Sequence, residues 1–93
     1  MKNRYVLYSD AGHGWLAVPI KDVRELNIKI TPYSYRKGNT LYLEEDCDLS
    51  RFWKAYEQKT GNKLEYKEVY HGNRSRIRGF YESIPEDLVE LQS

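Results

Sequence analysis

The clearest pattern in the sequence is a helical stripe of apolar residues. Its four members recur at the spacing of one face of an α-helix: Leu49, Phe52, Trp53 and Tyr56. Gly61 follows and supplies the left-handed backbone that commonly ends helices. A helix with one apolar face buries it against another element, and a chain of 93 residues has room for one such core. The pattern therefore predicts a single small domain built around this helix.

Much of the remaining sequence has the alternation or composition of short β-strands. We expect strands over residues 4–9, 15–18, 33–36, 41–44 and 63–70. A first helix is expected to begin at Pro19 and to end at Asn27, which tolerates left-handed backbone. Asp46 or Asp48 is expected to cap the second helix. The order β-β-α-β-β-α-β predicts a small two-layer α+β domain, mostly antiparallel sheet with two helices.

We expect this domain to span residues 1–82 and an acidic C-terminal extension to follow over residues 83–93. All 15 Lys and Arg residues lie before residue 81, whereas residues 81–93 carry acidic charges only. Residues 83–86 have the pattern of a helix capping box, and Ile84, Leu88 and Leu91 would share one helical face. The sequence leaves open whether the extension is a short helix or a frayed tail.

Composition limits the classes of function. The formal net charge is +1, so no global charge attracts the chain to nucleic acid or to a membrane. No run of about 18 apolar residues forms a membrane span, and residues 1–4 lack the apolar stretch of a secretion signal. The single cysteine, Cys47, cannot form an internal disulfide. We therefore expect a cytoplasmic protein that contacts no membrane and needs no cofactor.

The glycine-flanked loop after the first strand holds one group of candidate functional residues: Asp10, His13 and Trp15. In a hydrolase, Asp10 would orient His13 or His71 as the general base, with Ser9 or Cys47 as the nucleophile. This spacing matches no catalytic motif, and the two glycines equally explain a tight turn between strands. An enzyme is therefore the weaker expectation.

Potential metal ligands occur in three places along the chain. Two are His13 and His71, and the third is the segment 44–48, which holds Cys47 and the acidic run Glu44, Glu45, Asp46 and Asp48. No two of them have the spacing of a ligand pair such as C-x-x-C or H-x-x-x-H. The acidic run also lacks the glycine and the alternation of a calcium-binding loop. We expect no metal site and interpret the run as a solvated corner between a strand and a helix.

Three arginines alternate near the end of the domain: Arg74, Arg76 and Arg78. An extended backbone would direct all three to one face, beside Asn73. Arginine recognises carboxylate and phosphate equally well, so three interpretations stay open. The arginines pair with the carboxylates of residues 44–48, within the fold or across a homodimer; they bind nucleic acid; or they bind an acidic protein surface.

Tyrosine is the most unusual part of the composition, with nine Tyr against two Phe. A tyrosine buries a large ring and keeps a polar tip, and Tyr and Arg dominate the binding energy of protein interfaces. Tyr33, Tyr35 and Tyr42 lie on one predicted hairpin, and they cannot all face the same core. We therefore expect exposed aromatic surface, which favours a binding surface over an enclosed active-site pocket.

Four segments occur in a distinctive order: S-D-A-G-H-G-W-L-x-V-P (9–19), Y-S-Y (33–35), L-E-E-D-C-D (43–48) and N-R-S-R-I-R (73–78). Through them, residues 4–82 resemble a family of small, functionally uncharacterised proteins of tailed phages, prophages and plasmids. The resemblance implies no activity or catalytic residue. It implies that the gene lies on a mobile genetic element, where genes for counter-defence proteins such as anti-CRISPR or anti-restriction factors are common.

These observations together predict a phage or plasmid accessory protein that binds a host macromolecule without catalysis, for instance as a counter-defence inhibitor of a host or defence-system protein. The expected contact residues are Asn73, Arg74, Arg76, Arg78, Tyr33, Tyr35 and Tyr42, with the loop of Asp10, His13 and Trp15 as a second functional region. The alternative is a small nucleic-acid-binding module that uses the three arginines.

Overall fold

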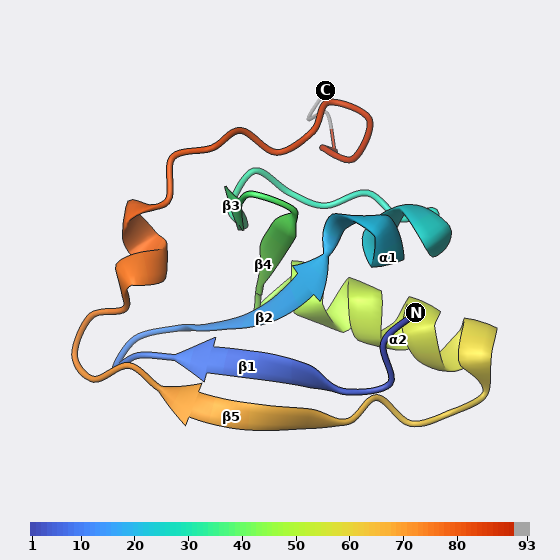
Figure 1. Cartoon of the computed structure of the whole chain (residues 1–93), viewed down its shortest axis with the longest axis horizontal. Helices are drawn as coiled ribbons and strands as arrows, with labels where there is room; N and C mark the ends of the chain where they lie inside the picture. Colours follow the sequence, from blue (N-terminus) through green and yellow to red (C-terminus); the bar gives the residue numbers. More distant parts are fainter. Residues whose placement is uncertain (91–93) are drawn as a thin grey trace.

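The computed structural model describes residues 1–90 and contains one five-stranded sheet with two α-helices (Figure 1). The elements in chain order are β1 (Tyr5–Ser9), β2 (Gly14–Pro19), α1 (Ile20–Glu25), β3 (Tyr35–Lys37), β4 (Thr40–Glu44), α2 (Asp48–Thr60), β5 (Tyr66–Tyr70) and the 3₁₀ helix η1 (Arg76–Gly79). The predicted fold class and the predicted order of strands and helices are confirmed.

The strands lie in the order β3-β4-β2-β1-β5. β2 is antiparallel to both β1 and β4, and β3 forms the expected hairpin with β4. Gly38 makes the tight hairpin turn with a φ of 59°, which a glycine adopts without steric cost. β5 lies parallel to β1. The chain leaves β4, passes through α2 and returns as β5 at the opposite edge of the sheet. The sheet is therefore mostly antiparallel, as expected, with one parallel edge.

One face of the sheet packs against the helices. Alternate residues of the strands point to this face and are fully buried: Tyr5, Leu16, Val18, Leu41 and Leu43. The stripe on α2 covers them, with the ring of Phe52 edge-on to that of Tyr5 at 5.4 Å between centroids. Val23 of α1 joins the same cluster. The predicted helical stripe thus faces the core, with Phe52 and Tyr56 buried in it and Leu49 and Trp53 packed at its margin.

The opposite face of the sheet carries a second layer of aromatic side chains. By strand alternation this face bears Tyr8, Trp15, Tyr35 and Tyr42. The segment around η1 covers part of it: Ile77 is buried, and the ring of Phe80 lies 5.2 Å from that of Tyr42. Trp15 is also buried, although it lies outside the core cluster under the helices. The sheet therefore has helices on one face and the η1 segment on part of the other.

Helix ends are partly as predicted. Asn27 has a left-handed φ of 54° after α1, and Gly61 has a φ of 72° after α2, so both expected stops are confirmed. The expected cap of α2 is wrong, because Cys47 occupies the N-cap position and makes no side-chain cap hydrogen bond. Asp48 begins the helix instead. Its buried carboxylate accepts hydrogen bonds from the backbone N–H and hydroxyl of Thr31 and from the hydroxyl of Ser34.

The segment after η1 runs along the outer side of β3 toward α1 (Figure 1). Residues 83–86 do not begin a helix; a turn at 86–88 is followed by a bridge between Ile30 and Val89. Leu88 is buried in the core, and Arg24 forms an ion pair with Asp87. Leu91, which was expected to share the helical face, lies outside the described residues.

Candidate functional site

The buried carboxylate of Asp10 organises the polar end of the sheet. Its Oδ1 accepts the backbone N–H groups of Gly12 (3.0 Å) and His13 (2.9 Å). Its Oδ2 accepts the backbone N–H of Ser75 at 2.8 Å. The guanidinium of Arg78 donates to both oxygens, at 2.6 Å from Nε and 3.0 Å from Nη2. Asp10 therefore ties the β1–β2 loop to the η1 segment.

This arrangement fixes the charge state of the pair. Hydrogen bonds from Arg78, aided by those from Ser75, Gly12 and His13, hold the pKa of Asp10 well below its usual range. The same contact raises the pKa of Arg78. An anion so firmly held acts as a structural acceptor.

The residues proposed for a hydrolase site do not contact one another in the way that catalysis would require; Ser9 and His71 have other partners. Ser9 Oγ donates to Glu68, and Nδ1 of His71 lies 2.7 Å from the hydroxyl of Ser75. Within residues 1–90, no hydrogen bond joins the Asp10 carboxylate to the ring of His13 or His71. The structure thus brings Asp10 and His13 together through the His13 backbone rather than through its ring.

The three arginines point to different surroundings because their backbone is not an extended strand. Ser75 caps η1 by accepting the N–H of Ile77 at 3.1 Å, and the 3₁₀ turn then begins at Arg76. Arg78 turns inward to Asp10, with its Cζ 5.3 Å from the ring centroid of Trp15. Arg74 and Arg76 remain exposed. The single face expected for all three requires an extended backbone and does not form.

The internal ion pairing considered for the arginines has a different acidic partner. Arg78 pairs with Asp10, and none of the ion pairs among the described residues joins an arginine of this cluster to the carboxylates of residues 44–48. Arg74 and Arg76 form no ion pair and donate no side-chain hydrogen bond within that part of the chain. Two positive charges thus face solvent.

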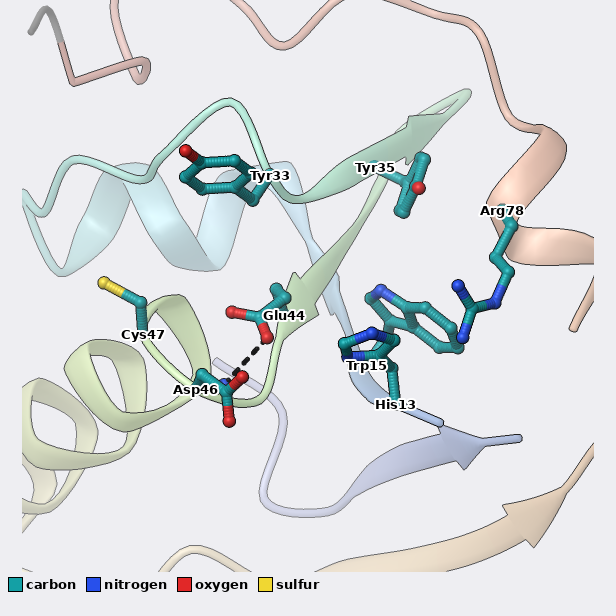
Figure 2. Close-up of a pocket in the computed structure, with 8 residues that line it drawn as sticks. All are labelled: His13, Trp15, Tyr33, Tyr35, Glu44, Asp46, Cys47 and Arg78. Carbon is teal, nitrogen blue, oxygen red and sulfur yellow. Dashed lines mark hydrogen bonds between the residues drawn. The ribbon is translucent and has the colours of Figure 1, made fainter. Parts of the chain in front are cut away.

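An open cavity of about 440 Å³ lies where the β1–β2 loop, the β3–β4 hairpin and η1 meet (Figure 2). All eight residues of its lining are candidates from the sequence, five as binding or loop residues and three as potential metal ligands or nucleophile: His13, Trp15, Tyr33, Tyr35, Arg78, Glu44, Asp46 and Cys47. The rings of Trp15 and Tyr35 meet edge-on at 6.1 Å, and Tyr33 is 68% exposed at the rim. The cavity therefore combines aromatic walls with groups of both charges, although Asp10 and His71 do not line it.

Both His13 and the acidic corner are potential metal ligands from the sequence, but their spacing gave no reason to expect them side by side. Trp15 pairs with Glu44 across β2 and β4, and the backbone N–H of Glu45 donates to Gly14. Because of this register, the loop that contains His13 lies beside the turn that contains Asp46. Glu44 is half-buried, and this burial raises the pKa of its carboxyl. The hydrophobic alternation of β2 and β4 predicts that each is a strand, but it does not show that the two are neighbours in the sheet.

Tyr42 belongs to the packed aromatic layer. It is half-buried, its ring lies 6.2 Å from that of Tyr8 and 5.2 Å from that of Phe80, and burial raises its pKa. Among the three hairpin tyrosines, Tyr33 is exposed, and Tyr35 and Tyr42 are intermediate.

Another hollow, of about 330 Å³, is lined by His71, Arg74 and Arg76. The ring of His71 packs against that of Tyr8, with 4.8 Å between the centroids. Tyr70 precedes His71 and is 63% exposed, and Asn73 is exposed in the turn between them and the arginines. We call the group formed by Tyr70, His71, Arg74 and Arg76 the basic patch.

No helix within residues 1–90 has the length and apolar character needed to cross a membrane. Comparisons with protein-family models, with curated proteins and with solved structures find no match to this chain.

Proposed function

We propose that the protein is a non-enzymatic binding module whose basic patch recognises an acidic protein surface. The observation that carries the proposal is the exposure of Arg74 and Arg76, which have no ion-pair partner among the described residues. Arginine and tyrosine are the residues that most often dominate interface energy, and Tyr70 adds an exposed ring to the patch.

The backbone under the patch is held in place, which lowers the entropy lost on binding. Asp10 accepts the N–H of Ser75, the residue between the two arginines, and the backbone N–H of His71 donates to Ser9. Ile77 anchors the following turn in the aromatic layer. The two guanidinium groups thus extend from an ordered base.

A protein partner fits these features better than nucleic acid. Binding along a phosphate backbone depends on many cationic contacts, whereas the patch offers two free arginines in a chain of net charge +1. The resemblance to phage and plasmid proteins would make the partner a host defence protein in the cytoplasm, with inhibition by binding. That narrower proposal rests on the resemblance alone.

The test is a quantitative pull-down from host lysate with the full chain as bait. The Arg74→Glu/Arg76→Glu double variant is expected to lose the protein that the wild type retains. A Lys21→Glu/Lys54→Glu double variant makes the same charge change at exposed sites on α1 and α2, and it should retain that protein.

Labelled DNA and RNA oligonucleotides form the second arm, measured by fluorescence anisotropy at low salt. We expect no arginine-dependent binding to them. Capture that is equal in the wild type and the Arg74→Glu/Arg76→Glu variant would overturn the proposal. Salt-sensitive oligonucleotide binding that this variant abolishes would replace it with the nucleic-acid function.

A further inference from the structure

Three side chains with metal-binding atoms converge at the cavity. They are His13 in the β1–β2 loop, Glu44 at the end of β4 and Asp46 in the turn before α2. One ligand atom from each lies within 4.8 Å of those from the other two. Figure 2 shows the imidazole ring and both carboxylates around the same space, whereas the sulfur of Cys47 points away from it.

Paired backbone holds the three groups together. The β2–β4 ladder pairs Trp15 with Glu44, and the N–H of Glu45 donates to the carbonyl of Gly14 at 3.0 Å. The side chain of Glu45 lies against Gly14, where a Cβ would be 2.9 Å from its Oε2. Asp10 fixes the other end of the loop through the N–H of His13. The donor groups therefore stand on an ordered frame.

Neither of the two carboxylates forms an ion pair with a lysine or arginine among the described residues. The ion pairs among residues 1–90 involve Glu25, Asp87, Glu90 and Asp10, and neither Glu44 nor Asp46 takes part in one. The backbone N–H of Asp46 donates to Oε1 of Glu44 at 3.1 Å, as the dashed line in Figure 2 shows. Neighbouring carboxylates disfavour each other's charged form unless a positive charge compensates. A bound cation would supply that charge.

We propose that His13, Glu44 and Asp46 form a binding site for a divalent transition-metal ion. One imidazole nitrogen with two carboxylate oxygens suits Zn²⁺ or Fe²⁺ better than Mg²⁺ or Ca²⁺, which take oxygen ligands. Three protein ligands leave coordination positions for water or for an anionic ligand on the cavity side. The sequence spacing does not indicate this site, because its members come from separate segments. The proposal is independent of the basic patch.

Titration calorimetry with Zn²⁺ on the chelator-treated full chain tests it. We expect one Zn²⁺ per wild-type chain, and we expect affinity to fall by more than about tenfold in His13→Ala and in Asp46→Asn. His71→Ala removes the other histidine and Glu45→Gln neutralises the neighbouring carboxylate, so both should keep wild-type affinity. Circular dichroism establishes that each variant is folded. Zn²⁺ should raise the thermal midpoint of the wild type and not that of His13→Ala.

The proposal is overturned if His13→Ala binds Zn²⁺ as tightly as the wild type, because the metal would then sit on surface carboxylates alone. It is also overturned if the folded wild-type chain binds no Zn²⁺. Tighter binding of Ca²⁺ or Mg²⁺ than of Zn²⁺ in parallel titrations contradicts the donor assignment.

Discussion

The guanidinium of Arg78 donates two hydrogen bonds to the carboxylate of Asp10, although the residues are 68 positions apart in the sequence. The pair joins the loop after β1 to η1 and leaves the Asp10 side chain without solvent contact. Charge-assisted bidentate pairs of this geometry are among the stronger hydrogen-bonded contacts in proteins.

Replacing Asp10 with asparagine is expected to destabilise the fold. The Asp10→Asn side chain keeps the shape but loses the charge and one acceptor, so Arg78 and the N–H of Ser75 lose partners. We expect the thermal midpoint at pH 7 to fall by about 5 °C or more. Differential scanning calorimetry measures it, and Glu45→Gln, an exposed neutralisation, serves as the control. Equal midpoints for the two variants would contradict this role of Asp10.

The same pair predicts a specific acid dependence. The pKa of Asp10 is lowered in the folded chain, whereas an aspartate in the unfolded chain has a pKa of about 3.9. The stabilisation is therefore complete above about pH 4 and is lost as the pH falls below that value. The stability gap between wild type and Asp10→Asn should be constant from pH 7 to 5 and should narrow toward pH 2. Urea unfolding at each pH tests this, and a gap that does not narrow rules it out.

Gly12 lies against the pair and should resist substitution. A Cβ on Gly12 would lie 3.1 Å from Nη2 of Arg78, a guanidinium that Asp10 already holds. Gly12→Ala is expected to lower the thermal midpoint by about 2–4 °C, whereas Gly79→Ala, which meets nothing within 4 Å, should change it by less than about 1 °C. In the Asp10→Asn background the Gly12→Ala effect should shrink, because the guanidinium is freer to move. Additive effects would argue against this coupling.

Asp48 is expected to stabilise the fold by holding the segment before β3 against the start of α2. Its fully buried carboxylate accepts bonds from Thr31 and Ser34, and an amide would turn a donor toward at least one of those donors. Asp48→Asn should lower the free energy of unfolding by about 1–3 kcal/mol. Urea denaturation measures the change. Asp46→Asn, at an exposed position, should stay within about 0.5 kcal/mol of wild type in the presence of a chelator.

The sequence predicted local elements well because their signals are local. The stripe containing Phe52 and Tyr56, the stop at Gly61 and the hairpin around Gly38 all depend on neighbours within a few positions. The Asp48 cap failed because its carboxylate finds distant partners in Thr31 and Ser34.

Long-range pairing decided what the sequence did not predict about the site. The alternation of Arg74, Arg76 and Arg78 implies one face only in an extended chain, and the Ser75 cap produces a 3₁₀ turn instead. The convergence of His13 with the acidic corner follows from the β2–β4 register. Neither feature shows in residue spacing. The turn at the arginines depends on the local cap that Ser75 forms, whereas the inward direction of Arg78 and the convergence of His13 with the acidic corner depend on partners distant in the sequence.

The parallel pairing of β1 with β5 bears on how the chain reaches its native state. β1 meets β2 across a short loop, but it gains β5 only after both helices and the hairpin have been synthesised. Closing such a distant contact costs chain entropy before it contributes stability, which slows folding. During translation, Tyr5–Ser9 therefore emerges as an uncovered edge, and this interval is when a nascent chain is most exposed to aggregation or to capture by a chaperone.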